Sequence, residues 1–371
     1  MNKASSIYLD LVRFLAAATV FLVHAQYERF TGGLPLVAAT AKLGNDAVMV
    51  FFVLSGFVIA YVADKKEKTL KDYALSRLAR LYSVAAPALA LTVAVDYIGS
   101  RIDYGLYTGW DFPTDHPLWR VLANFFFVNE LWFFSVRPFS NGPYWSLGYE
   151  FWYYVIFAAA FYFKPPVRYW LVVLACCIAG PKILLLFPIW LLGVWVYHVT
   201  KTRTIGETLG WILFLGSIGT YLFFRIAGYP EFLLDRTVAT FGDTVVDGWL
   251  GQSKYFLSSY VIGPLVALHF VGLSVVSQKF GRFLEVFERP IRYLASYTFA
   301  IYLFHFPLLQ FFAALCIAVA PSLRSTMVLL GVVATIWVVG AVTESRRADL
   351  KRWLGSMSDV IHRRASSGGR V

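Results

Sequence analysis

Apolar segments that can cross a membrane recur along almost the whole chain. A helix rises 1.5 Å per residue, so about 20 apolar residues span a hydrocarbon core roughly 30 Å thick. Only 15% of the 371 residues are charged and 58% are hydrophobic, whereas about a quarter are charged in soluble domains. The sequence therefore predicts an all-α polytopic membrane protein, a bundle of about ten transmembrane helices. The candidate spans are 7–27, 44–63, 81–98, 145–163, 167–180, 183–199, 209–226, 255–276, 293–316 and 323–343.

Basic residues in the short loops indicate how this bundle is oriented. Lysine and arginine concentrate in cytoplasmic loops of membrane proteins, and here they follow 44–63, 145–163, 183–199 and 255–276 and fill the tail. A further apolar stretch, 119–135, would reverse every later loop if it crossed, so we expect a re-entrant or interfacial segment there. Both termini are then predicted to be cytoplasmic, and 99–118 and 227–254 to lie outside.

The net charge of +11 is explained by the same loops, and no nucleic-acid-reading motif accompanies it, so no nucleic-acid partner is expected. Residues 1–344 are predicted to form one transmembrane domain, and 345–371 a disordered, basic cytoplasmic tail. The cysteines lie in apolar runs without disulfide or metal-ligand spacing, so no metal site is expected; they are Cys176, Cys177 and Cys316.

The first span carries three ionisable residues on one helical stripe: Asp10, Arg13 and His24. An ionisable group at a helix centre costs about 2.5–3.5 kcal/mol on insertion scales, so each of them needs a partner or a function. The spacing of Asp10 and Arg13 favours a structural ion pair. For His24 two interpretations stand, a hydrogen-bonded interfacial histidine or a functional one.

Two carboxylates are predicted at the depth of His24, near the outer surface. Asp46 opens the second span, and Glu150 follows PYWSLGY at 143–149. A histidine beside a carboxylate is suited to general acid–base catalysis, because the carboxylate orients the imidazole and raises its basicity. Ser146 lies four residues before Glu150 without a nucleophile elbow around it, so we interpret it as a helix cap.

Two further pairs occur at helical spacing. Arg77 and Arg80 lie three apart at the cytoplasmic end of the third span, as ordinary loop charge or as a bidentate site for phosphates. Tyr302 and His305 lie three apart near the middle of the ninth span, where a histidine is seldom without a role. We expect both to support the site.

Five segments in this order resemble the acyltransferase-3 family of integral-membrane O-acyltransferases, and the resemblance runs from about residue 5 to 344. The segments are LDLVRFLAAATVFLVHA (9–25), FFVLSGFVIAY (51–61), SRLARLY (76–82), PYWSLGYEFWYY (143–154) and SYTFAIYLFHFP (296–307). The resemblance implies a bacterial inner-membrane enzyme. It would move an acyl group, commonly acetyl, from cytoplasmic acyl-CoA to a hydroxyl of a carbohydrate acceptor outside. Acyl-CoA is then a donor substrate, and no permanently bound cofactor is expected.

The resemblance also assigns roles to residues. It makes His24 the catalytic histidine, Arg77 and Arg80 the donor-binding pair, and Glu150 the acid. Many members have a second acid two residues before the paired phenylalanines; here Met49 takes that place, and Asp46, about one turn earlier, is the candidate substitute.

In the predicted mechanism, His24 takes the proton of the acceptor hydroxyl while Glu150 or Asp46 holds the imidazole. A covalent acyl-histidine intermediate is a variant of this scheme. The expected acceptor is a cell-envelope or exported polysaccharide, such as exopolysaccharide or lipopolysaccharide. The alternative is a transporter that exports an anionic solute, with His24 and Glu150 as a proton relay.

Overall fold

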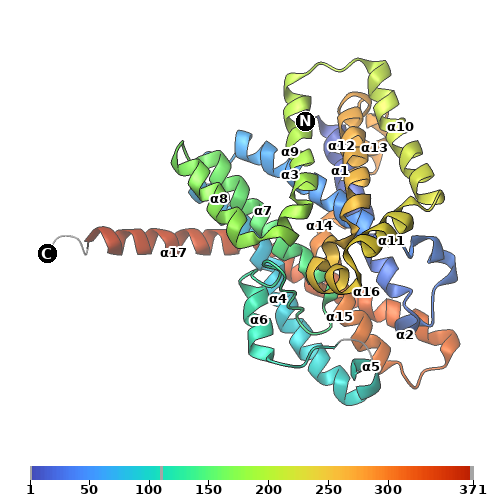
Figure 1. The fold of residues 1–371 in the computed structure, drawn as a ribbon. Coiled ribbons are helices and arrows are strands. Elements are labelled where there is room, and N and C mark those ends of the chain that lie inside the picture. The colour runs from blue at the N-terminus through green and yellow to red at the C-terminus, as the bar shows by residue number, and fades with distance from the viewer. Residues whose placement is uncertain (1, 109–111, 368–371) are drawn as a thin grey trace.

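The computed structural model describes residues 2–108 and 112–367, and all regular secondary structure in them is helical (Figure 1). Within this part of the chain, eight helical segments are long and apolar enough to cross a membrane. The all-α polytopic fold is therefore confirmed. The helices in these segments are α1 (Lys3–Ala25), α3 (Gly44–Lys65), α4 (Leu70–Ile102), α9 (Pro181–Thr202), α10 (Glu207–Ile226), α12 (Phe256–Val276), α15 (Thr298–Leu315) and α16 (Pro321–Ser345).

The remaining elements are shorter or more polar. They are α2 (Glu28–Thr31), η1 (Pro35–Thr40), α5 (Tyr104–Thr108), α6 (Pro117–Phe125), η2 (Gly142–Tyr144), α7 (Trp145–Tyr162), α8 (Val167–Ala179), α11 (Tyr229–Phe241), η3 (Thr244–Leu250), η4 (Gly251–Tyr255), α13 (Gly281–Val286), α14 (Glu288–Ser296) and α17 (Arg347–Ser367).

Two of the ten expected spans are not among the eight. Residues 167–180 form α8, which has only 13 residues, too few to cross a 30 Å core. Residues 145–163 form α7, whose tyrosines, tryptophans and Glu150 lower its mean hydropathy; α7 and α8 pack against each other. The nine-residue helix α6 ends at Phe125, and the rest of the stretch 119–135 is irregular chain, so this stretch does not form a spanning helix.

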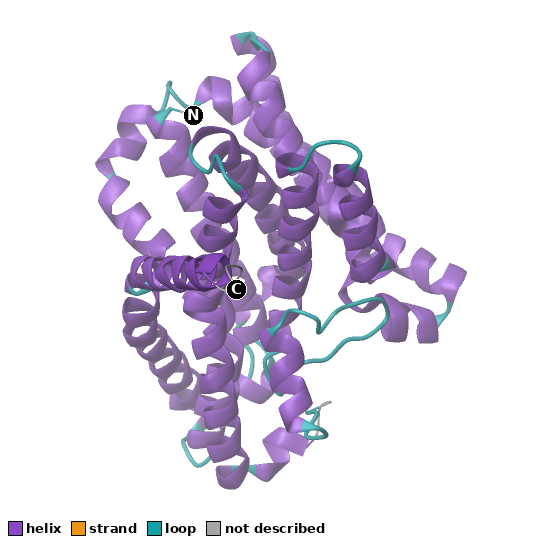
Figure 2. Ribbon diagram, turned by 90° about the vertical axis from the view of Figure 1, so that its left-hand side faces the viewer, coloured by secondary structure: helices purple, strands orange, loops and turns teal. Residues whose placement is uncertain are grey.

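The tail differs from its predicted disorder. Residues 347–367 form α17, which extends sideways from the bundle in Figure 1 and is seen nearly end-on in Figure 2. Asp349 accepts a hydrogen bond from Arg352 at 2.6 Å, an i,i+3 pair of the kind that stabilises a helix, and α17 packs on α4. This pair and the packing on α4 support the helical form of the segment. Residues 368–371 of the predicted tail lie outside the described residues.

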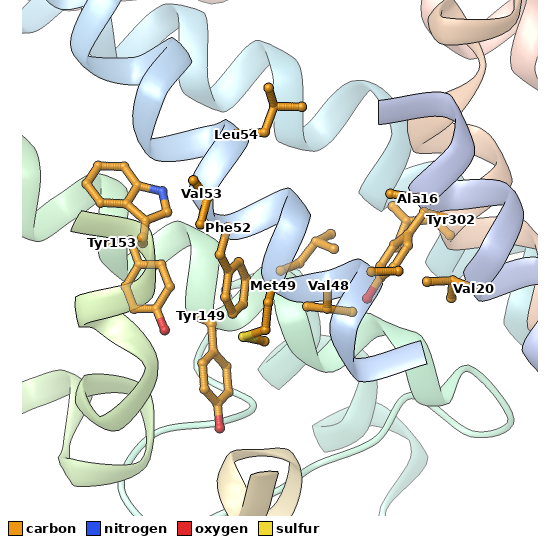
Figure 3. Close-up of a cluster of buried hydrophobic side chains, with 14 of the residues drawn as sticks. Ala16, Val20, Val48, Met49, Phe52, Val53, Leu54, Tyr149, Tyr153 and Tyr302 are labelled. Atoms are coloured by element: carbon orange, nitrogen blue, oxygen red, sulfur yellow. The ribbon is translucent and has the colours of Figure 1, made fainter. Parts of the chain in front are cut away.

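Helix α3 lies at the centre of the bundle, against α1, α9 and α12. Its closest neighbour is α9. A Cβ atom on Gly56 would collide with the carbonyl oxygen of Trp190, and one on Gly193 with that of Val53. Small residues that let two backbones touch are the usual means of joining helices in a membrane. Figure 3 shows the apolar side chains of this core, with Phe52 of α3 beside the tyrosines of α7.

A buried ion pair holds the irregular chain after α6. Lys182, at the start of α9, is 1% exposed, and its Nζ lies 2.5 Å from Oε2 of Glu130. Lys182 also donates to the carbonyl oxygen of Phe134, and Ser135 donates to Glu130 at 2.9 Å. These partners offset the cost of burying two charges. The loop is thereby fixed to the start of a spanning helix.

The contact between α3 and α9 predicts a specific sensitivity to added volume. Gly193→Ala should destabilise the protein by about 1–3 kcal/mol, because overpacking forces the backbones apart. Gly216→Ala is the matched control, since a Cβ there meets nothing within 4 Å and alanine favours a helix. Thermal unfolding of the two variants in detergent would compare them, and an unchanged Tm for Gly193→Ala would contradict the tight contact.

Candidate active site

A cavity of about 310 Å³ lies between seven helices, and many of the residues that line it are polar. Four arginines contribute to its wall, each from a different helix: Arg13 (α1), Arg80 (α4), Arg292 (α14) and Arg347 (α17). A second set of polar groups, from α3, α7 and α15, lines the rest of the cavity; it comprises Ser55, Glu150, Tyr154, Ser146 and Tyr302. The cavity therefore combines a cationic part with hydroxyl and carboxyl groups.

Asp10 and Arg13 form the ion pair that their spacing indicates. Asp10 Oδ1 lies 2.9 Å from Arg13 Nη2, and Asp10 Oδ2 lies 2.8 Å from Arg292 Nη1. Arg13 also donates to the carbonyl oxygen of Ala295 at 3.4 Å. One carboxylate thus orders two cavity arginines and ties α1 to α14.

Arg77 and Arg80 do not share an environment, although they lie on one helical face. Arg77 is buried and donates from Nη2 to Oε1 of Glu67 at 2.8 Å. Its guanidinium also lies 5.6 Å from the centre of the Tyr73 ring. Arg80, by contrast, lines the cavity. The structure therefore places one arginine in a structural ion pair and the other where a ligand can reach it.

Glu150 lies in the cavity wall within a hydrogen-bond network between α3, α7 and α9. Its Oε1 accepts from Ser55 Oγ at 2.7 Å and from the hydroxyl of Tyr154. Trp190 Nε1 donates in turn to Ser55 Oγ at 3.2 Å. The carboxylate is held in place by these hydroxyl donors.

The sequence predicts that Ser146 caps α7, but the structure shows no such cap. The 3-10 turn η2 leads directly into α7, so Ser146 lies inside the first turn and no side chain caps the helix. Its hydroxyl instead shares a hydrogen bond of 2.8 Å with Tyr302. Figure 3 shows Tyr302 beside Ala16 and Val20 of α1 and Val48 of α3. The Ser146–Tyr302 pair therefore closes one side of the cavity.

His24 and His305 face each other one helical turn beyond Tyr302. Nδ1 of His24 lies 2.9 Å from Nε2 of His305, and Nδ1 of His305 lies 2.8 Å from the carbonyl oxygen of Ile301. Because a carbonyl only accepts, His305 must donate from Nδ1 and accept at Nε2 when it is neutral. We assign the tautomers from this network: His24 donates from Nδ1, and its Nε2 remains a base. His305 is fully buried, whereas His24 is half-buried.

The imidazole of His24 is therefore held by a second histidine, and in the described part of the chain no carboxylate hydrogen-bonds to it. Asp46 accepts from the hydroxyl of Tyr221 at 2.8 Å and pairs with Arg225 Nε at 3.1 Å. That ion pair joins α3 to α10, away from His24. The predicted contact of the His24 imidazole with Asp46 or Glu150 is therefore wrong. Each of these carboxylates is hydrogen-bonded by nearer donors instead. The sequence indicates His305 through its mid-span position and its place in the segment 296–307, but it does not indicate that His305 is the partner of His24.

The fold and the cavity define a polytopic helical membrane protein with a polar, cationic cavity and a histidine pair next to Tyr302 of its wall. A family model described as an acyltransferase domain matches residues 6–344. The chain thus belongs to the acyltransferase-3 family, as the five sequence segments indicate.

The comparisons add one curated relative. "Protein 2 in picA locus" of Rhizobium radiobacter is 42% identical over 92 residues, which make up 24% of this chain and 44% of that protein. The chain thus matches less than half the length of that relative. No solved structure matches the chain.

The different surroundings of the two arginines generate a paired prediction. Arg77→Met should lower the Tm strongly, because it leaves Glu67 buried without its cation, a loss of about 3–5 kcal/mol in buried pairs. Arg77→Met combined with Glu67→Gln should regain part of this stability. Arg80→Met is the matched control and should leave the Tm close to that of the wild type. Equal Tm losses for the two single variants would contradict the assignment.

Proposed function

We propose that this protein moves an acetyl group from cytoplasmic acyl-CoA to a hydroxyl of a carbohydrate at the outer side of a bacterial inner membrane. One observation carries the proposal. The arginine-lined cavity leads to Ser146 and Tyr302, and the ring of Tyr302 is centred 6.4 Å from that of His305, the partner of His24. A donor and an acceptor could thus approach one buried centre from opposite ends. Family membership supports the acyl-transfer chemistry.

The cationic part of the cavity suits the donor. Guanidinium groups bind phosphates through paired hydrogen bonds, and Arg80, Arg292 and Arg347 come from three separate helices around the cavity. The cavity volume of about 310 Å³ is at the lower end of small-molecule pockets. We infer that the nucleotide of the donor stays among the arginines and that only its narrow pantetheine arm enters. Glu150 then faces this arm.

The histidine pair suits the acceptor. In our proposal, Nε2 of His24 takes the proton of the acceptor hydroxyl as its oxygen attacks the thioester carbonyl. The carbon–sulfur bond breaks, and the thiolate leaves with the proton that the imidazolium returns. His305 accepts the Nδ1–H of His24 and so keeps Nε2 in its basic form, which is the task of the third group in a catalytic triad. His305 is a positioning residue in this scheme.

The activity test uses purified protein in proteoliposomes, supplied with acetyl-CoA and glycans from a strain that lacks the gene. Release of CoA together with alkali-labile acetyl on the glycan is the expected result. Protein that consumes no acetyl-CoA in the presence of any glycan fraction would overturn the proposal and favour the transporter alternative.

Substitutions of the two histidines should have different strengths. His24→Ala should lower kcat by about 10²–10⁴-fold, the usual loss for a general base. His305→Phe should lower kcat less and leave the KM of the donor unchanged, because only the orientation of His24 is lost. His198→Ala is the control, since His198 is exposed at the far end of α9. Full activity of well-expressed His24→Ala protein would refute the mechanism.

The proposed orientation rests on the ends of the helices. Lys201 Nζ lies 3.0 Å from Asp64 Oδ2, so the basic ends of α3 and α9 lie together. A cysteine at Thr204 should therefore label only from the cytoplasm, and cysteines at Ser100 or Thr244 only from outside, in a background without the native cysteines. Labelling of Thr204 from outside would place the donor entrance on the wrong side.

A further inference from the structure

Arg29 lies beside the histidine pair, on the side away from the donor cavity. It belongs to α2, the short helix that follows α1 directly. Its guanidinium lies over three aromatic rings, 4.4 Å from the centre of Phe30, 5.5 Å from Phe306 and 5.8 Å from Tyr27. The carbonyl oxygen of Arg29 accepts from Arg324 at 3.4 Å, which links α2 to α16. The three ring contacts hold the Arg29 side chain in place, and the hydrogen bond from Arg324 holds its backbone.

Two of these rings also enclose His24. The ring of Phe306 is centred 5.0 Å from the imidazole and that of Tyr27 5.4 Å from it, both edge-on. Arg29 and His24 thus pack on the same two aromatic side chains. A ligand whose hydroxyl reaches Nε2 of His24 would lie within reach of the guanidinium.

The guanidinium of Arg29 keeps its positive charge beside these rings. Burial, together with the neighbouring Arg137, lowers the pKa of the Arg29 guanidinium to about 10, so it stays charged at neutral pH. A charged guanidinium at this place favours an anionic group on a ligand over a neutral one.

Aromatic rings beside a guanidinium match a particular kind of acceptor. The rings can stack on the apolar face of a pyranose, and the guanidinium can form paired hydrogen bonds with a carboxylate or a phosphate. We infer that the acceptor is an acidic glycan, in which the acylated sugar or its neighbour carries an anionic group that binds Arg29. This inference rests on the proposed function and specifies its acceptor.

The first experiment asks where the acyl ester goes. Glycans from wild-type and deletion strains are separated by anion exchange, and the alkali-labile acetyl of each fraction is measured. We expect the deletion to remove acetyl from retained, acidic glycans. Loss of acetyl from neutral glycans alone would overturn the inference and leave the proposed function standing, whereas unchanged acetyl in every fraction would overturn both.

The second experiment tests the anionic group itself. The acidic glycan of the deletion strain serves as acceptor for purified enzyme in proteoliposomes, before and after its carboxyl groups are reduced to alcohols and its phosphates are removed. We expect the neutralised glycan to lose at least about 10-fold in kcat/KM, the loss typical of a charge-assisted hydrogen bond. An equal rate with both glycans would overturn the inference.

Variants of Arg29 then connect this preference to the residue. Arg29→Gln should raise the KM of the acidic glycan about 10- to 100-fold and leave the KM of acetyl-CoA unchanged, and Arg29→Lys should recover part of the loss. Arg236→Gln is the matched control, because Arg236 is exposed and also lies over a phenylalanine ring, 5.0 Å from Phe232. Wild-type acceptor KM in Arg29→Gln, or an equal rise in the KM of acetyl-CoA, would contradict the role of Arg29.

Discussion

The contact of α3 with α9 determines the geometry of the whole cavity wall. Because Gly56 and Gly193 have no side chains, the two backbones touch, and the indole of Trp190 reaches Ser55. Ser55 in turn holds Glu150 of α7. Membrane helices gain no hydrophobic energy from leaving lipid, so close packing of this kind is what joins them. The position of the Glu150 carboxylate on α7 thus depends on the lack of side chains at Gly56 and Gly193.

The ionisable residues of the bundle fall into two groups. Some form ion pairs that join helices or loops. These pairs are Asp46 with Arg225, Glu67 with Arg77 and Glu130 with Lys182. Others line the cavity or its far side, where a ligand can complete their surroundings. A charge inside a membrane protein marks either a structural joint or a functional site, and both occur here. Arg77 and Asp46 belong to the structural group, whereas Arg29 packs on the aromatic rings that enclose His24.

The sequence is informative where the signal is local and uninformative where it is not. Most spans follow from runs of apolar residues, and the Asp10–Arg13 pair follows from spacing within one helix. His24 and His305 are 281 positions apart, and no periodicity links residues on separate helices. Lys182 follows Pro181 and resembles an ordinary flanking lysine until Glu130 is placed beside it. In the tail, composition indicates disorder, whereas the structure describes residues 347–367 as the helix α17.

The hydrogen bond between Ser146 and Tyr302 has a consequence for the cell as well as for the reaction. The polar cavity and the half-buried His24 lie on two sides of the Ser146–Tyr302 pair. Without a barrier between them, the bundle would form a pore. The phenol and the packed side chains of α1 and α3 around it supply that barrier (Figure 3). In the proposed reaction an acyl group passes where water and ions must not, so the same few side chains would also protect the electrochemical gradient across the membrane.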